Sequence, residues 1–204
     1  MGREYKLNKS ELTRLKINFK IYAQFLPVLK LKQEQLQIEQ IRIKRVMLGI
    51  EKEYILMKEN IFSNTSIFFD ETNPYDIENL IKPISIDIYK KSVAGVNIPI
   101  LREIINNKSD IDVFMAPPWL LFILPQLRIL VKKDIEIKII TKQYDLITKE
   151  LKKSTQKVNL FEKILIPETN EAIKRIKIFL GDEEVAAVGR AKIAKNKNSK
   201  DLNF

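Results

Sequence analysis

The chain has 204 residues and a formal net charge of +10, from 36 Lys and Arg against 26 Asp and Glu. It contains no cysteine and no histidine. This composition excludes disulfides, thiolate nucleophiles and Cys-ligated metals, and it removes the commonest general base and metal ligand. The basic balance favours an acidic partner, which would be nucleic acid, a membrane surface or an acidic protein.

The first segment, residues 1–63, has the pattern of a coiled-coil helix. Asn8 followed by Glu11 predicts an N-cap with its box partner. Apolar residues then recur with alternating steps of three and four, which is typical of a coiled-coil seam. The seam positions are Leu12, Leu15, Phe19, Tyr22, Leu26, Leu29, Gln33, Leu36, Gln40, Ile43, Met47, Ile50, Tyr54, Met57 and Ile61. A helix of ~50 residues would be ~75 Å long.

Two features interrupt this seam. Pro27 lies inside the predicted helix and should kink it. Gln33 and Gln40 are polar at seam positions. Either they are partly exposed, or the seam is shifted to Leu31, Ile38 and Ile41, or they form a polar pair that sets the register with a partner helix.

The middle segment, residues 64–118, differs in kind because it holds five of the eight prolines. Alternation from Ile84 to Tyr89 and an extended run from Val93 to Leu101 predict a β-hairpin, with its turn at Lys90 to Ser92. Thr65 to Asp70 is either another short strand or a continuation of the helix.

The last segment, residues 119–204, repeats the three-four spacing and ends in a basic tail. Its seam positions are Ile137, Ile140, Tyr144, Ile147, Leu151, Ser154, Val158, Phe161, Leu165, Ile173, Ile176, Leu180 and Ala187. Pro125 and Pro167 should bend or open this helix locally. Since neither terminal segment can bury its seam alone, we predict a mainly α fold. It is a long antiparallel two-helix coiled coil, formed by the N- and C-terminal arms, with a small middle region that contains a β-hairpin.

Charge follows the same three segments. Residues 1–63 carry +6, residues 64–118 carry −3 and residues 119–204 carry +7. The coiled coil is therefore predicted to be basic and the middle region mildly acidic. No signal peptide and no membrane-spanning helix is predicted.

Motifs that carry chemistry are missing. Neither a P-loop nor a dinucleotide-binding glycine pattern occurs, and the acidic run at 182–184 is better explained as a solvated helix face than as a metal site. We therefore expect no catalytic, cofactor-binding or metal-binding residue. Trp119 is expected to anchor the core, the alternative being an exposed docking surface.

Three stretches of the chain resemble the D subunit of the V-type ATPases and ATP synthases. The N-terminal stretch is Leu7-Asn8-Lys9-Ser10-Glu11-Leu12, and the middle one contains Gly95-Val96 and Ile98-Pro99. The C-terminal resemblance is more specific and lies in Val158-Asn159-Leu160, Ile166-Pro167 and Ala191-Lys192-Ile193-Ala194-Lys195. The resemblance covers nearly the whole chain, the arms better than the middle.

The resemblance implies a mechanical part, the central-stalk rotor of a rotary machine that couples ATP to ion transport. Its implied partners are the catalytic and non-catalytic nucleotide-binding ring subunits, the small F subunit of the central stalk and the socket subunit on the membrane rotor. It implies no direct nucleic-acid contact, no membrane span, and a cytoplasmic location peripheral to the membrane. The candidate partner-binding residues are Arg190, Lys192 and Lys195 near the end of the coiled coil, and Ile86, Ile88, Val96 and Ile98 in the hairpin.

Two other classes remain open at this stage. A prefoldin-like chaperone also joins coiled-coil helices through β-hairpins, but its arms would be more equal and its middle smaller. A nucleic-acid-binding coiled coil would explain the charge. It should interleave aromatic and basic residues, whereas Phe19, Tyr22, Tyr54, Tyr144 and Phe161 occupy seam positions.

Overall fold

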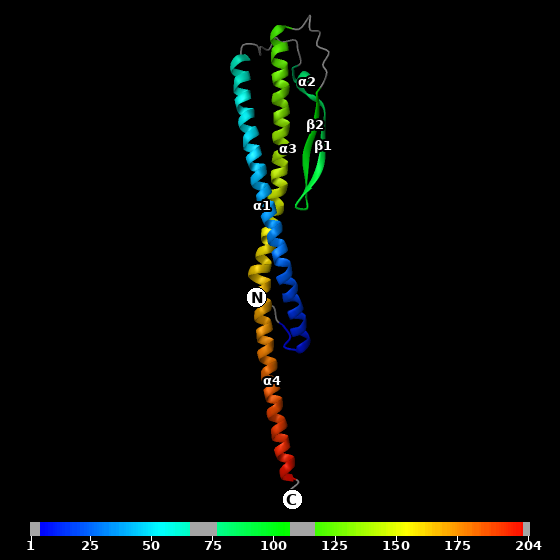
Figure 1. Cartoon of the computed structure of the whole chain (residues 1–204), viewed down its shortest axis with the longest axis vertical. Coiled ribbons are helices and arrows are strands. Elements are labelled where there is room, and N and C mark those ends of the chain that lie inside the picture. Colours follow the sequence, from blue (N-terminus) through cyan, green and yellow to red (C-terminus); the bar gives the residue numbers. More distant parts are fainter. Residues whose placement is uncertain (1–4, 66–76, 107–116, 202–204) are drawn as a thin grey trace. The chain divides into compact units, whose positions relative to one another are not determined.

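The computed structural model describes residues 5–65, 77–106 and 117–201. Its elements are α1 (Lys9–Thr65), α2 (Ile77–Ile81), β1 (Pro83–Val93), β2 (Val96–Asn106), α3 (Pro118–Leu160), the π-helical turn η1 (Phe161–Leu165) and α4 (Ile166–Asp201). Figure 1 labels the four α-helices and the two strands. The predicted mainly α fold with a small central hairpin is confirmed. Thr65 ends α1, and the rest of the Thr65–Asp70 stretch lies outside the described residues.

The start of α1 follows from the sequence. Asn8 Oδ1 accepts a hydrogen bond from the Glu11 backbone N–H at 2.7 Å, which confirms the predicted N-cap. The second half of the predicted capping box is wrong. The Glu11 carboxylate pairs with Arg14 at 2.6 Å, and the Asn8 backbone N–H donates to the Lys6 carbonyl instead.

The predicted seam of α1 is its packed face, since every one of its positions is buried or half-buried. The shifted seam is wrong because Leu31, Ile38 and Ile41 are all more than half exposed. Gln40 Nε2 donates to Thr148 Oγ1 across the seam at 2.8 Å, so this polar position pairs with the opposite helix.

The chain divides into two compact units. The first, called here the terminal unit, comprises residues 1–32 and 154–204. In it the start of α1 runs antiparallel to η1 and α4, because Lys30 Nζ donates to Glu162 at 2.7 Å while Leu12 packs near Ile176. Its apolar core consists of Leu12, Leu15, Ala172, Ile173 and Ile176.

The packed seam of α4 ends at Leu180. Every described side chain from Gly181 to Asn196 is exposed, so the prediction that the seam continues to Ala187 is wrong. The reason is the length of the partner. Leu12, the first core residue of α1, packs in the cluster that contains Ile176, and little of α1 precedes it to cover the later turns.

Proline has different local effects in the helices. Both α1 and α3 continue as helices through Pro27 and Pro125. Near Pro167 the helix instead widens into η1, where the Ile166 backbone N–H bonds to the Phe161 carbonyl. Proline lacks the N–H that an α-helical turn requires, and an i to i+5 bond beside it is one known adjustment.

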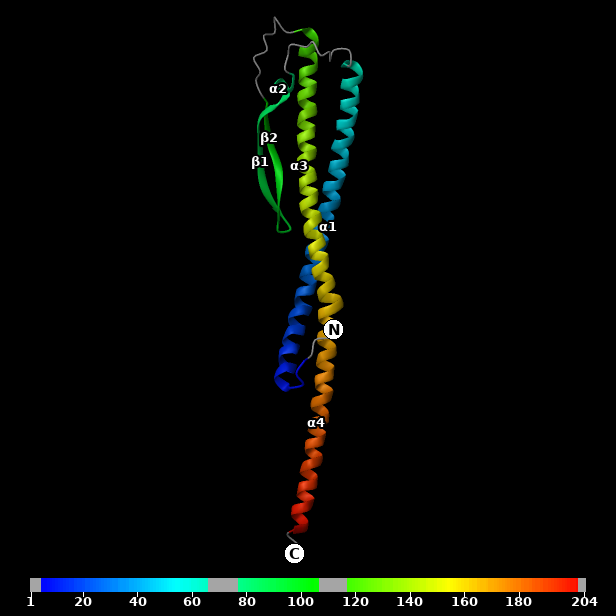
Figure 2. The same ribbon diagram turned by 180° about the vertical axis from the view of Figure 1, so that it is seen from behind.

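The second unit, called here the central unit, comprises residues 33–153. It has two cores along α1 and α3, and the hairpin lies alongside α3 (Figures 1 and 2). The first core consists of Leu36, Ile43, Ile98 and Ile147, and the second of Ile61, Ile123, Leu127 and Leu130. Trp119 is half-buried against the second core, in line with its expected anchoring role.

The hairpin turn lies later than the sequence pattern predicts. Strand β1 extends to Val93, which pairs with Val96, so the turn consists of Ala94 and Gly95. The predicted turn at Lys90 to Ser92 is wrong, because these residues pair with the second strand. A two-residue hairpin turn with positive φ at both positions is of type I′, and φ is 49° at Ala94 and 79° at Gly95.

The turn gives a pair of substitutions with opposite expected effects. Ala94→Gly should stabilise the hairpin by about 0.5–1 kcal/mol, because it removes a Cβ from left-handed backbone at some cost in chain entropy. Gly95→Ala should destabilise it by about 1 kcal/mol for the same steric reason. Amide hydrogen exchange of β1 and β2 measures both changes in stability. If both substitutions changed the stability of the hairpin in the same direction, the turn geometry would be contradicted.

Candidate partner-binding surfaces

The hairpin has one set of apolar residues that packs on the core and another set that is exposed to solvent. Ile98 is 3% exposed and packs into the core of the central unit, and Val96 packs against the same cluster. Ile86 and Ile88 are 41% and 45% exposed. Of the four hairpin residues predicted to bind a partner, Ile86 and Ile88 are therefore the two whose side chains are exposed in this unit.

A nearby isoleucine extends this exposed face. Ile84 is 66% exposed, and the sequence pattern marked it only as part of a strand. Ile86 and Ile88 are two positions apart in β1 and share one face of the strand, whereas Ile84 lies at a β-bulge between Pro83 and Ser85. These three exposed residues are here called the outer isoleucines. The apolar alternation is the signal that identifies them, since the opposite face of the same strand carries Ser85 and Asp87.

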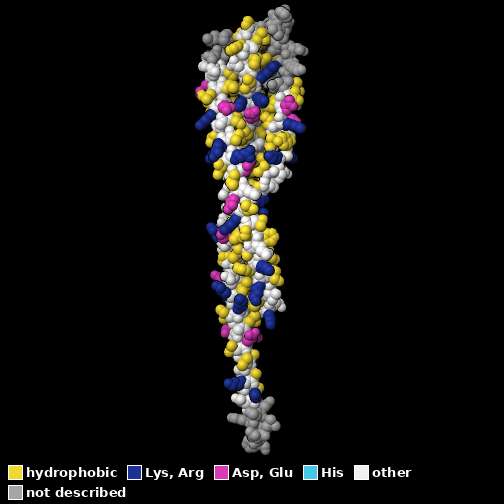
Figure 3. All heavy atoms as spheres, in the orientation of Figure 1, with side chains coloured by type: hydrophobic (Ala, Val, Ile, Leu, Met, Phe, Trp, Pro, Cys, Tyr) yellow, Lys and Arg dark blue, Asp and Glu magenta, His cyan; other side chains and the backbone are white. Residues whose placement is uncertain are grey.

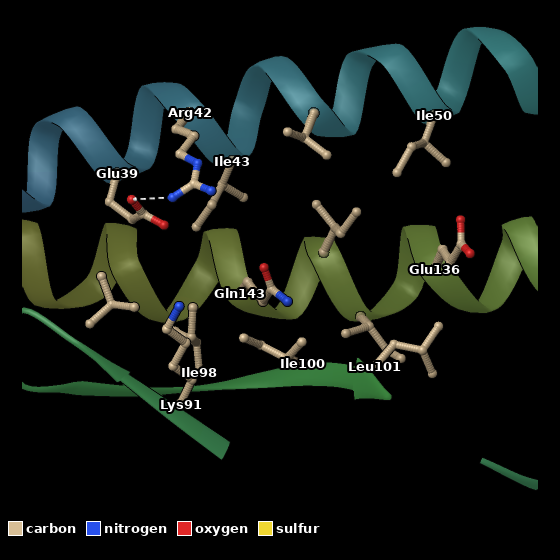
Figure 4. Close-up of a pocket in the computed structure, with 14 residues that line it drawn as sticks. Glu39, Arg42, Ile43, Ile50, Lys91, Ile98, Ile100, Leu101, Glu136 and Gln143 are labelled. Carbon is tan, nitrogen blue, oxygen red and sulfur yellow. Dashed lines mark ion pairs between the residues drawn. The ribbon is translucent and has the colours of Figure 1, made fainter. Parts of the chain in front are cut away.

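A cleft of about 370 Å³ lies between α1, α3 and the hairpin (Figure 4). Its wall is mostly aliphatic, with Ile43 from α1, Ile139 from α3 and Ile98 from β2. Glu39 and Arg42 form an ion pair at one rim. The lining of the cleft is aliphatic and its rim is charged, an arrangement that suits the binding of an apolar group better than catalysis.

A side-chain hydrogen bond ties the hairpin to α3 beside this cleft. Gln143 Nε2 donates to the Pro99 carbonyl at 2.5 Å. Together with the burial of Ile98, this bond holds one face of the hairpin on α3 and leaves Ile86 and Ile88 on the other.

In the central unit, an ion pair between α1 and α3 raises the pKa of a lysine. Lys133 Nζ donates to Glu53 Oε2 at 2.6 Å, and this hydrogen bond raises the pKa of Lys133 above its ordinary value of 10.5. The stability that the pair contributes is fully present below that ordinary value and is lost as the pH rises through the raised pKa. Around neutral pH the lysine side of this pair is therefore insensitive to pH.

The end of α4 is the second predicted surface. Arg190, Lys192 and Lys195 all lie on a helical segment whose described side chains are exposed. Exposed apolar residues share this segment, with Val185 at 74% and Val188 at 69%. The three predicted basic residues thus lie together on one short stretch, and they are in a different unit from the hairpin residues.

Charged and apolar side chains are interleaved along the helices on the face that Figure 3 shows. In the terminal unit the aromatic rings of Tyr22 and Phe161 meet edge to face, with centroids 5.5 Å apart. These rings are used for packing, which disfavours base stacking as their role. Among the described residues no group of His, Cys, Asp and Glu side chains is arranged to hold a metal ion, and no described helix is long and apolar enough to cross a membrane.

These observations define a class of protein: an antiparallel coiled coil with a β-hairpin, whose exposed surfaces are suited to binding other proteins. The family model described as the D subunit of ATP synthase matches residues 11–196. The chain belongs to this family.

Bacterial relatives match over nearly their whole length. A D subunit of the V-type ATP synthase from Borreliella burgdorferi is 38% identical, over 94% of this chain and 93% of the relative. Relatives of the same name from Chlamydia pneumoniae and Chlamydia felis are 32% and 30% identical, over 95% and 97% of this chain and 89% and 95% of theirs. The family resemblance inferred from the sequence is confirmed.

Proposed function

We propose that this chain is the central-stalk rotor subunit of a V-type ATPase or ATP synthase, which transmits torque between the nucleotide-binding ring and the ion-translocating membrane rotor. The observation that carries the proposal is the match to a relative named as the D subunit of a V-type ATP synthase over 94% of the chain. On this proposal the chain is a non-catalytic part of the complex. It works in the cytoplasm, peripheral to the membrane.

The helical packing supports a mechanical role. A shaft that carries torque must resist twisting, and two helices with interlocked seams resist it better than one helix alone. Each unit of this chain has such a packed seam, with Leu36 and Ile147 in the central unit and Ile176 in the terminal unit all fully buried. Hydrogen-bonded pairs across the seam, such as Gln40 and Thr148, then oppose sliding of one helix along the other.

The two surfaces divide the proposed partners between them. The exposed end of α4, with Arg190, Lys192 and Lys195, would enter the ring of catalytic and non-catalytic nucleotide-binding subunits. The outer isoleucines of β1 would contact the small F subunit of the central stalk or the socket subunit on the membrane rotor. Basic residues on an exposed helix favour an acidic lining in the ring, because complementary charge guides and orients association.

Affinity purification of the tagged full chain from native membranes tests this proposal. We expect the nucleotide-binding ring subunits and a small central-stalk subunit to be recovered with it. Recovery of nucleic acid or of unfolded client proteins in their place would contradict the rotor assignment.

Neutralising the end of α4 gives a quantitative version of the test. Arg190→Gln, Lys192→Gln and Lys195→Gln combined should weaken binding to the ring by about tenfold at low salt, from three exposed ion pairs at about 0.5 kcal/mol each. The binding of the variant should also depend less on salt, since fewer charges remain to be screened.

A matched control removes the same charge from the hairpin. Lys90→Gln, Lys91→Gln and Arg102→Gln combined also remove one Arg and two Lys, all of them exposed. Affinity for the ring should be unchanged in this control. Equal weakening by both variants would indicate a general effect of net charge and would contradict a specific role for the end of α4.

A further inference from the structure

Helix α1 carries a second apolar seam on the side opposite its packed face. In the terminal unit, the positions Ile17, Ile21, Gln24, Val28 and Leu31 follow alternating steps of four and three. At 100° per residue these positions lie about half a turn away from the core residues Leu12 and Leu15. We call this set the back seam.

The back seam is exposed although it is apolar. Ile17 is 55% exposed, Val28 is 61% and Leu31 is 55%, and Phe25 beside them is also 55% exposed. Single exposed aliphatic residues need no explanation, but a contiguous row at heptad spacing marks an interaction site.

The charges along the back seam are mainly basic, with acidic residues only at its two ends, where Glu11 pairs with Arg14 and Glu34 follows Leu31 by three positions. Residues 12–33 contain no Asp or Glu, and Lys20 and Lys32 flank the seam on its two sides. Two copies of this chain that paired through the back seam would bring these like charges together, which is unfavourable. The complementary surface is apolar with acidic residues along its edges.

The polar position in the seam favours a protein over a lipid surface. Gln24 lies between Ile21 and Val28 and is exposed. In helix pairs one polar seam residue sets the register at some cost in stability. A lipid surface has no register to set, and an amide turned toward acyl chains would only cost free energy.

We propose that the back seam of α1 binds an α-helix of a partner protein, with apolar residues at heptad spacing and acidic residues beside them. The partner helix adds a third strand to the coiled coil at this point. The inference is independent of the rotor assignment, because it rests on the surface of the terminal unit alone.

Site-specific photo-crosslinking of the full chain in cells tests the proposal. The photoreactive residue p-benzoylphenylalanine is placed at Ile21 or at Val28, seven positions apart on the same seam, and at Ala23 as a control. Ala23 is also exposed but lies away from the back seam. Mass spectrometry of the cross-linked peptides identifies the contact.

The expected result is specific in geometry. Probes at Ile21 and Val28 should label one helical, acidic segment of another protein at two sites about seven residues apart. The Ala23 probe should not label this segment. An adduct with lipid, an adduct with a second copy of this chain, labelling of a non-helical segment, or labelling no stronger than at Ala23 would each overturn the proposal.

Charge and polarity variants provide a second readout. With the probe at Ile21, Val28→Asp or Leu31→Asp should reduce the yield of cross-linked product to that of the Ala23 control, because a carboxylate would be buried in the seam. Lys20→Glu should reduce it through repulsion of the acidic edge. These side chains are exposed in the chain itself, so the helical circular dichroism of all three variants should match that of the parent. An undiminished yield in the Asp variants would overturn the proposal.

Discussion

Leu36→Ala is expected to lower the free energy of unfolding of the purified chain by about 2–5 kcal/mol. Leu36 is fully buried in the core where α1 meets α3 and the hairpin, and Ile147 beside it is also fully buried. Truncation at this point removes apolar contacts and leaves a cavity that the surrounding helices fill only in part. Urea unfolding followed by circular dichroism measures the change.

Ile38→Ala is the matched control for this prediction. Ile38 lies two residues further along the same helix and is 67% exposed. Its truncation should change the free energy of unfolding by less than about 0.5 kcal/mol, as for most surface substitutions. If Ile38 proved the more costly of the two, the packed face of α1 would be the shifted seam.

Pro27→Ala should raise the free energy of unfolding by about 2 kcal/mol. Proline costs roughly 3 kcal/mol relative to alanine inside a helix, and the freer unfolded chain of the alanine variant offsets about 0.5–1 kcal/mol of the gain. Pro27 is exposed within α1, so its removal leaves no cavity. The shift of the urea midpoint at unchanged slope gives the effect.

Gln24→Ala is the control for Pro27→Ala. Gln24 lies three residues before Pro27 in the same helix and is exposed. Its substitution should raise the free energy of unfolding only by the small difference in helix propensity between glutamine and alanine, about a few tenths of a kcal/mol. A Pro27→Ala variant no more stable than the Gln24→Ala variant would mean that the surrounding packing already compensates for the proline.

The seam of α1 could be predicted because its signal is long and regular. A polar residue at one seam position changes the prediction little when many turns follow the same spacing, and Gln33 and Gln40 interrupt the pattern without shifting it. The end of the α4 seam could not be predicted in this way. The apolar periodicity runs on to Ala187, and only the place where α1 begins decides how much of it is covered.

The hairpin was harder for a related reason. Alternation identified the first strand and an extended run identified the second, but the turn depended on two residues of unusual backbone, and one of them is alanine. Moving the turn from Lys90–Ser92 to Ala94–Gly95 lengthens the first strand. Which face of the hairpin packs on α3, and hence the burial of Ile98, depends on tertiary contacts that have no local signal.

The candidate surfaces were predicted in part. The basic end of α4 and two exposed isoleucines of β1 were identifiable from charge and alternation. The back seam was visible only as an alternative core, through Leu31. A pattern of two apolar seams on one helix does not reveal which seam packs within the chain, and the exposure of Leu31 resolves this.

Direct observation of rotation tests the proposed function most closely. The chain has no cysteine, so Glu103→Cys provides a single attachment point for a bead in the assembled, immobilised complex. Glu103 is exposed on β2 and pairs with Asp87, on the face opposite Ile86 and Ile88. The rotor assignment predicts that the bead turns in one direction when ATP is added and stops when ATP is removed. A complex that hydrolyses ATP while the bead on this chain stays still would contradict it.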